Sequence, residues 1–469
     1  MFQRSNQGPC IPIDRPDPTR MLHRHIGRPA STWTINDLVA VVRELDIRVL
    51  SLMHVGGDGW LKTLDFVPRD AVHLADVLAG GERADGSSLF GDLGIPADAS
   101  DIVIRPRLST AFMDPFSSEP TLAVLCSHFN RRGGPLAESP DTVVRAAYAR
   151  MVAETGIELH ALGEIEFFLG LHGEGALVYG ANERGYHASS PFVFGEPLRR
   201  QALICLAEMG VPVKYGHAEV GYAEADQADP WVWEQHEIEL WLQPLPEAAD
   251  AVVLTQWVRR NLAQRHKMVC SFAPMARKGH AGSGMHFHFA PCANGVYRPH
   301  TTADGNLTDE AKWLICGLVE HGAAMMAFGN HSPDSLVRLK QGKETPAALT
   351  WGRYDRKALI RIPVVPADAD GRETSAATIE FRLPDGSANP HLLLAGVAQA
   401  LVAGKSISDP DGLLARTAVT AQGPASSEYR VPLTFGEVAD AVVASRAMLE
   451  SGGIFTANLL DRVIALLRV

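Results

Sequence analysis

The segment Ala281–Phe289, which reads Ala-Gly-Ser-Gly-Met-His-Phe-His-Phe, decides the fold of this chain. Its two histidines stand two positions apart inside an apolar run, and a β-strand alternates its side chains between two faces. We therefore expect His286 and His288 on one face of a strand and the apolar side chains on the other. The preceding glycines, Gly282 and Gly284, allow the backbone to approach a ligand closely.

Three further segments repeat this alternation, with acids or arginine in the polar positions. The pairs are Glu164 with Glu166, Glu237 with Glu239, and Glu380 with Arg382. Any one segment alone fits an amphipathic strand with a solvated polar face. If the four strands are neighbours in one sheet, however, several carboxylates and at least one imidazole share a face. Such carboxylates repel each other unless a cation lies among them, and this ligand set suits Mg²⁺ or Mn²⁺.

In their order along the chain, these segments resemble the glutamine synthetase family. The resemblance covers residues 32–465, and its most specific blocks are Gly282–His288 and Ile379–Asp385, the latter followed by Ala388–Pro390. It implies an α+β fold, in which a small N-terminal β-grasp domain precedes a large catalytic domain with a curved antiparallel sheet. We expect an N-terminal extension at 1–31, the β-grasp domain at 32–115 and the catalytic domain at 116–469.

Composition narrows the functional class. The 469 residues are 46% hydrophobic and 21% charged, as in ordinary globular enzymes. A net charge of -11 without a basic block argues against nucleic-acid binding. No apolar run reaches the length of a membrane span, and the N-terminus lacks the apolar core of a signal peptide. Six scattered cysteines are typical of a reduced compartment, so we expect a cytoplasmic protein.

The resemblance implies an ATP-dependent ligase that joins glutamate and ammonia through a γ-glutamyl phosphate. A carboxylate is a poor electrophile and must be activated before an amine attacks it. The phosphates of ATP require cations and arginines, and deprotonation of the amine requires an anionic pocket. The sequence contains all of these residue types.

By the same resemblance, six residues are expected to hold two or more Mg²⁺ or Mn²⁺ ions per subunit. The ligands of one ion would be Glu166, Glu219 and Glu237, and those of the second would be Glu164, His286 and Glu380. The second ion would lie beside the phosphates of ATP, the co-substrate. These cations would neutralise the transferred phosphoryl group.

The remaining site residues are also implied by the resemblance. Arg356 and Arg361 are expected to bind phosphate, and His288 lies on the nucleotide side. Arg338 and Arg382 are expected to hold the substrate's α-carboxylate, a bidentate task that suits arginine. The backbone of Gly282 would face the substrate amino acid.

A second group is expected to serve the nitrogen donor. Glu344, in a glycine-containing polar loop, would close the site and take a proton from the attacking nitrogen. Asp85 would reach the site of a neighbouring subunit, and Ser88, Tyr186 and Glu219 would complete the ammonium pocket. A shared site predicts a ring-based homo-oligomer, with a dodecamer favoured.

The sequence also departs from the family pattern. Ala281 stands where asparagine is usual, and Glu219 and Glu237 are separated by an insertion, Val220–Gln235, that contains two tryptophans. These tryptophans would line an amine pocket or pack a subunit contact. A long C-terminal arm that clasps the opposite ring is missing, which would weaken ring pairing. The alternatives to ammonia ligation are a γ-glutamyl amine ligase, acting on a primary amine or polyamine, and a non-catalytic structural family member.

Overall fold

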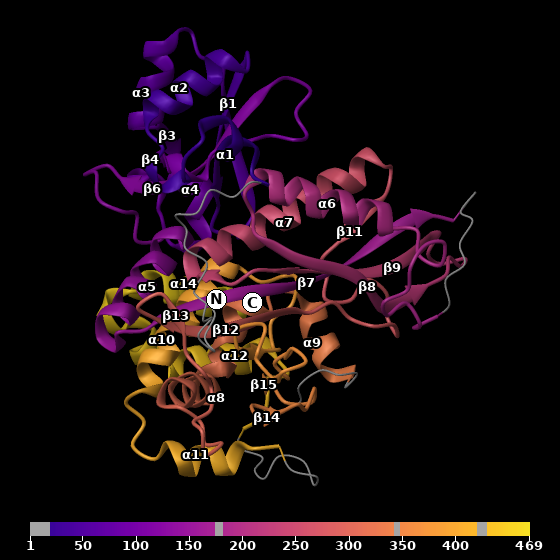
Figure 1. The fold of residues 1–469 in the computed structure, drawn as a ribbon. Coiled ribbons are helices and arrows are strands. Elements are labelled where there is room, and N and C mark those ends of the chain that lie inside the picture. Colours follow the sequence, from indigo (N-terminus) through magenta and orange to yellow (C-terminus); the bar gives the residue numbers. More distant parts are fainter. Residues whose placement is uncertain (1–18, 174–181, 342–347, 420–428) are drawn as a thin grey trace.

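The computed structural model describes residues 19–173, 182–341, 348–419 and 429–469. The chain forms an N-terminal unit and a larger catalytic unit, with helices α6 (Glu196–Met209) and α7 (Leu245–Arg265) running between them (Figure 1). No helix in the described part of the chain is long and apolar enough to cross a membrane.

The N-terminal unit is a sheet with helices packed against it. Its helices are α1 (Met21–Ile26), α2 (Ile35–Glu44), α3 (Ala71–Gly80) and α4 (Gly86–Phe90). Its strands are β1 (Val49–Val55), β2 (Leu61–Phe66), β3 (Glu82–Asp85), β4 (Asp101–Pro106), β5 (Phe112–Met113) and β6 (Thr121–Asn130). The strand order is β2-β1-β6-β4-β3, with β1 and β6 parallel and β5 paired to β6.

Local signals explain where the two main helices of this unit begin. Thr34 and Asp37 form a reciprocal capping box at α2, and Asp70 caps α3 by accepting from the His73 amide. Both helices then bury one apolar side against the sheet, with Leu38 and Leu74 in the core.

The core of the N-terminal unit extends beyond the range 32–115 expected for the β-grasp domain. Leu22 of α1 is 1% exposed and packs in the same cluster as Leu122 of β6. Strand β6 lies in the middle of the sheet. We therefore propose that this domain runs from α1 to the end of β6.

The catalytic unit is built on one long sheet. Its main strands are β7 (Glu158–His172), β8 (Val213–Ala223), β9 (Trp231–Leu240), β12 (Met285–Ala293), β14 (Trp351–Arg353), β15 (Ile360–Ile362) and β16 (Ile379–Phe381). The order is β14-β15-β16-β12-β7-β9-β8, antiparallel except for β14 with β15. The short strands β10 (Gln243–Pro244) and β11 (Val269–Ser271) pair with β7, and β13 (Val296–Tyr297) pairs with β12. The four charged segments are thus adjacent strands, which meets the condition set by the sequence analysis for a shared polar face.

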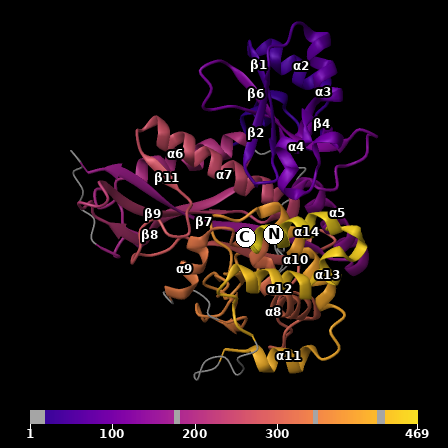
Figure 2. The ribbon, with the colours of Figure 1, turned by 180° about the vertical axis from the view of Figure 1, so that it is seen from behind.

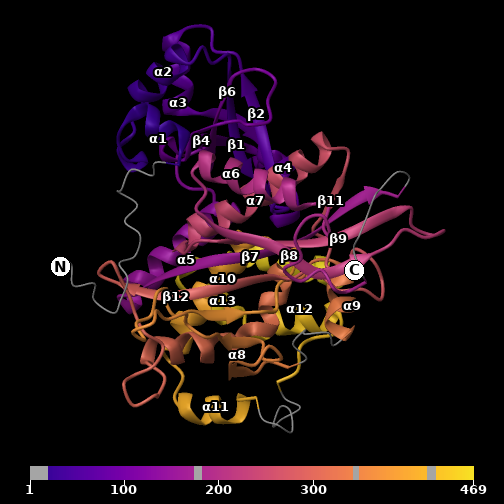
Figure 3. The ribbon, with the colours of Figure 1, turned by 45° about the vertical axis from the view of Figure 1, so that its right-hand side comes forward.

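The helices of this unit are α5 (Pro140–Thr155), α7, α8 (Asp309–Gly329), α9 (Pro333–Gln341), α10 (Pro390–Gly404), α11 (Pro410–Thr417), α12 (Phe435–Ala444), α13 (Arg446–Glu450) and α14 (Ala457–Leu467). At the apolar face of the sheet, α5 and α7 contact β7 and α8 contacts β15, and α10 packs on these three helices. Phe287, Phe289 and Phe381 point to this face and are fully buried. Figures 2 and 3 show the C-terminal helices gathered in the catalytic unit. The opposite face of the sheet is left to the charged residues.

Candidate active site

The polar face of the sheet brings the predicted residues into register across four strands. His286 lies opposite Glu164, and Glu166 lies opposite Glu237. His288 lies opposite Glu380 on the other side of β12. Direct partners in antiparallel strands share a face, so these side chains gather in one place.

In the first half of the site, two histidines lie among acids. His286 Nδ1 is 3.2 Å from Glu164 Oε2 and 3.7 Å from Glu380 Oε1. His288 Nε2 is 3.0 Å from Glu164 Oε1, and its Nδ1 hydrogen-bonds Thr378 Oγ1 at 2.9 Å. Ligand atoms of Glu164, His288 and Glu380 lie close enough together to hold one metal ion. Either imidazole therefore has the position to join Glu164 and Glu380 as a ligand.

Arginines complete the charge balance of this half. Arg361 Nη1 donates to Glu380 Oε2 at 2.7 Å, and Arg382 donates to Glu380 Oε1. Burial opposes ionisation of Glu380, but His288 and Arg382 outweigh it and leave the pKa of Glu380 lowered. In the same way, burial is outweighed at Glu164 by the two histidines, so the pKa of Glu164 lies well below its usual range.

The second half of the site is short of positive charge. His217 Nε2 is 3.2 Å from Glu237 Oε1, and His217 Nδ1 is 3.7 Å from Glu219 Oε1. Burial, followed by the charge of Glu166, raises the pKa of Glu219 to about 8. Burial together with the surrounding acids holds the pKa of Glu237 well above its usual range. A cation among these acids would relieve both effects.

Glu166 joins this second half to the glycine loop. Its Oε2 accepts from the Gly284 amide at 2.8 Å and from Gln235 Nε2 at 3.0 Å. Gln235 Nε2 also donates to the Gly282 carbonyl at 3.0 Å. A Cβ at Gly282 would lie 2.8 Å from the Pro274 carbonyl oxygen, so the loop needs glycine there.

The buried side chain of Arg338, which belongs to α9, packs against the same loop. Its guanidinium donates to the Leu383 carbonyl at 3.3 Å, and a Cβ added to Gly284 would lie 2.9 Å from Arg338 Nη2. Arg338, one of the two arginines expected to hold a carboxylate, therefore lies at the same end of the site as Gly282.

Tyr186 lies beside the second half of the site, which holds Glu219 and Glu237 and is called the acid-rich half below. The Gly185 amide donates to the Val220 carbonyl at 3.3 Å, which places this segment along β8 next to Glu219. The Tyr186 ring meets the His217 ring edge-on, with 5.5 Å between centroids. Tyr186 is 51% exposed, so the ring stands at the mouth of the site.

Two predicted residues lie outside the catalytic sheet. Asp85 and Ser88 belong to the N-terminal unit, where Asp85 accepts from the Ser88 hydroxyl at 2.7 Å and caps α4. Glu344 falls outside the described residues. Arg356 lies in an exposed turn and acts electrostatically on Glu219, lowering the pKa that burial raises.

The insertion forms the outer part of the β8–β9 hairpin. Trp233 Nε1 donates to Asp229 Oδ2 at 2.8 Å, and a Cβ at Gly170 would lie 2.8 Å from the Trp233 ring. Trp231 meets His172 edge-on at 5.5 Å. Both indoles thus pack on their own hairpin and on β7.

Two residues of this site were not predicted from the sequence. His217 and Gln235 bind the expected acids directly. Both carry the signal used elsewhere, since each stands two positions before an expected ligand, Glu219 or Glu237.

Comparison with known proteins gives a consistent result. Family models match residues 46–131, described as the glutamine synthetase beta-Grasp domain, and residues 137–468, described as the glutamine synthetase catalytic domain. A glutamine synthetase of Azospirillum brasilense is 28% identical, over 92% of this chain and 94% of its own. That of Escherichia coli (strain K12) is 28% identical, over 84% and 87%.

Solved structures share the fold. A Plasmodium falciparum glutamine synthetase, at 19% identity, superposes with a TM-score of 0.76 over 93% of this chain and 95% of that one. A structure titled GmaS, without ligand, is also 19% identical, with a TM-score of 0.69 over 92% and 95%.

Proposed function

Since this chain belongs to the glutamine synthetase family, whose members are ATP-dependent ligases, we propose that it joins glutamate and ammonia at the expense of ATP. The observation that carries the proposal is the set of acids and histidines on the polar face of β12, β7 and β9. Such a surplus of buried carboxylates fits a reaction that needs divalent cations and an ammonium pocket.

We propose that Glu166, Glu219 and Glu237 hold one divalent ion and that Glu164, His286 and Glu380 hold a second. The donor set fits Mg²⁺ or Mn²⁺, because five carboxylates supply hard oxygen ligands and one imidazole is acceptable to Mn²⁺. The raised pKa values of Glu219 and Glu237 show that the chain's own side chains leave this half undercompensated. When bound, the ions would neutralise the phosphates of ATP.

Glutamate is proposed to bind through its α-carboxylate to Arg338 and Arg382, with its amino-acid end against Gly282. Arg382 already donates to Glu380, and the planar guanidinium with its five N–H donors suits a carboxylate. Arg361, Arg356 and His288 are proposed to bind the nucleotide phosphates, and Glu344 to take the proton of the attacking nitrogen.

Ammonia is preferred to a larger amine because polar groups crowd the acid-rich half. Glu219, His217 and Tyr186 lie together there, and the two insertion tryptophans pack on their own hairpin. Ammonium is small and needs several acceptors. An alkylamine needs an apolar channel, and the indole contacts described above do not supply one.

Asp85 and Ser88 are proposed to act in trans. Their place on the N-terminal unit fits a site completed by a neighbouring copy in a ring, with twelve subunits favoured. The Asp85 pKa is lowered by hydrogen bonds from Ser88 and Ser87, so the carboxylate would reach a cationic substrate ionised.

The direct test is phosphate release from ATP with Mn²⁺ and glutamate, comparing ammonium with methylamine, ethanolamine and 1,4-diaminobutane. We expect kcat/KM to be highest for ammonium. A clearly higher kcat/KM for any of the amines would replace this proposal with γ-glutamyl amine ligation.

A further inference from the structure

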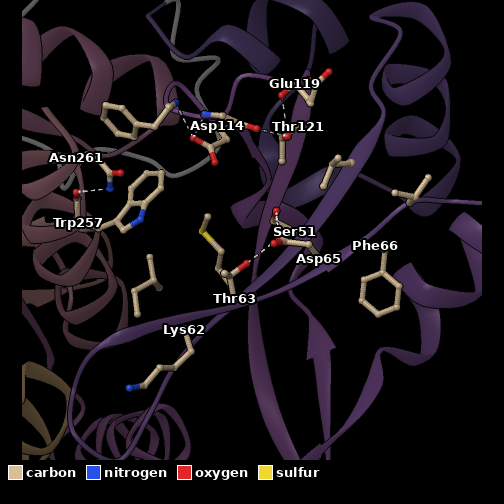
Figure 4. Close-up of a pocket in the computed structure, with 16 residues that line it drawn as sticks. Ser51, Lys62, Thr63, Asp65, Phe66, Asp114, Glu119, Thr121, Trp257 and Asn261 are labelled. Carbon is tan, nitrogen blue, oxygen red and sulfur yellow. Dashed lines mark hydrogen bonds between the residues drawn. The ribbon is translucent and has the colours of Figure 1, made fainter. Parts of the chain in front are cut away.

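A cavity separates the N-terminal sheet from helix α7. Its volume is about 470 Å³, and none of the acids of the catalytic sheet lines it. One face of the N-terminal sheet packs on α2 and α3, whereas the other turns toward α7. On that second face, Ser51 lies opposite Asp65 and Met53 lies opposite Thr63, so their side chains line the cavity (Figure 4).

The cavity is acidic on two sides. Asp65 comes from β2, where it accepts from Ser51 Oγ at 2.5 Å and from Thr63 Oγ1 at 3.0 Å. Asp114 comes from the loop after β5 and accepts from the Phe116 amide at 2.7 Å. Burial raises the pKa of Asp114, although the Phe116 and Ser117 amides and the charge of Arg265 oppose it, and the charge of Asp65 adds the smallest contribution. A carboxylate has about four acceptor positions, so each retains capacity for a ligand.

Two positive groups lie near the cavity, and the charge of Arg265 acts on Asp114. Lys62 Nζ lies 2.6 Å from Asp58 Oδ2, and in Figure 4 its amine points away from Asp65 and Asp114. Arg265 lies over the ring of Phe116, with 5.1 Å to the centroid, and donates to the Phe116 carbonyl. The cavity lining itself contains three acids, Asp65, Asp114 and Glu119, and one lysine, so it keeps an excess of negative charge.

Aromatic and aliphatic side chains form the remaining wall. Trp257 of α7 packs edge-on against Phe116, with 5.0 Å between centroids, and Leu61 and Met53 line the opposite side. An aromatic face beside carboxylates attracts organic cations through both the ring quadrupole and the charge. An apolar chain attached to the cation would lie against Leu61 and Met53.

From this combination we propose that the cavity is a second, non-catalytic binding site for a primary alkylammonium ion. Its ammonium group would bind between Asp65 and Asp114, and its aliphatic chain would pack against Trp257. Because the cavity is lined by β1 and β2 on one side and α7 on the other, a bound ligand would link the N-terminal unit to the catalytic unit. This site is distinct from the nitrogen-donor pocket at Glu219.

The test is calorimetric titration of the full-length protein with butylammonium chloride, in the presence of EDTA and without ATP or glutamate. We expect saturable binding that Asp65→Asn and Asp114→Asn each weaken at least tenfold. Asn keeps an acceptor oxygen for the Phe116 amide, so the turn at 114 is preserved. The control Asp76→Asn removes an exposed charge of the same kind from α3 and should bind as the native chain does. Butan-1-ol, which is neutral and of similar size, should not bind.

The proposal is overturned if the native chain does not bind butylammonium, or if both cavity variants bind it unchanged. The second result would place the amine at the catalytic pocket instead. Should Asp114→Asn fail to fold, Asp65→Asn and Trp257→Leu provide the same comparison. Phosphate release with ammonium should be unchanged in Asp65→Asn, so failure here is separable from failure of the ligase proposal.

Discussion

The two halves of the polar face hold similar acids in opposite electrostatic states. Around Glu380 and Glu164, two histidines and two arginines supply the counter-charge, and the pKa values of these acids are lowered. Around Glu219 and Glu237, burial and repulsion raise the pKa values instead. The chain's own histidines and arginines balance the acids of one half, whereas the acids of the other half repel each other. The difference is set by which strands are adjacent, since β15 and β16 carry the arginines.

The largest effect should come from removing a ligand from either half. Glu166→Gln and His286→Ala should each lower kcat/KM for the ammonium reaction by about a thousandfold, because a metal ion stabilises several kcal/mol of transition-state charge. Circular dichroism should show an unchanged fold. Activity within about tenfold of the native chain, at saturating Mn²⁺, would remove that residue from the ligand set.

Among the effects on the free energy of unfolding, we expect the largest in the half of the site around Glu164 and Glu380, where charges are balanced. Glu380→Gln leaves Arg361 and Arg382 without the carboxylate that both now contact, at a position only 1% exposed. Removing one partner of a buried ion pair costs about 3–5 kcal/mol. Urea unfolding of the metal-free variant should therefore show a clear loss. A change below about 1 kcal/mol would mean that solvent already screens the pair.

In the acid-rich half, removing a carboxylate should stabilise the fold instead of destabilising it. A raised folded-state pKa contributes stability that is fully present below the unfolded value and is lost as pH rises through the folded one. For Glu219 this window runs from its ordinary value of 4.5 to about 8. In EDTA, Glu219→Gln should therefore gain about 1–2 kcal/mol over the native chain between pH 5 and pH 9.

Unfolding curves at these two pH values, for both chains, supply the check. Added Mn²⁺ should cancel the advantage of the variant, because a cation then stabilises the native carboxylates. A Glu219→Gln curve that stays parallel to that of the native chain across the pH range contradicts the charge imbalance.

The smallest effect belongs to the inserted hairpin, outside both halves. Trp233→Phe deletes one hydrogen bond to Asp229 and should lower stability by about 1 kcal/mol, with the ring contact to Gly170 largely kept. Kinetics with ammonium and ethanolamine should not change. A selective change with ethanolamine would instead show that the indole contacts the nitrogen donor.

Much of the polar face could be predicted because side chains along a strand alternate between its two faces. That period gave Glu164 with Glu166 and His286 with His288, and these pairs do share a face. The adjacency of the strands and the charge balance could not be predicted, because they depend on pairing between segments far apart in the chain. The ion pair of Lys214 illustrates this. The pairing of β8 with β9 shifts register between Val213 and Tyr215, and Lys214 Nζ lies 2.5 Å from Glu239 Oε1.

The N-terminal unit was less predictable at its edges. Met21–Ile26 lies within a stretch rich in arginine and proline, and its burial comes from contacts that no local pattern encodes. Leu22 is buried because the sheet of this unit presents an apolar surface to it. In contrast, the Thr34 capping signal is local, and α2 begins at the residue that follows it.

Calorimetric titration with Mn²⁺ tests the central claim most directly, since the claim is that both halves bind cations. The native chain should bind two or more ions per subunit. Glu237→Gln should lose an ion of the acid-rich half while keeping one at Glu164 and Glu380, and His286→Ala should show the reverse. Native stoichiometry and affinity in both variants would contradict the account.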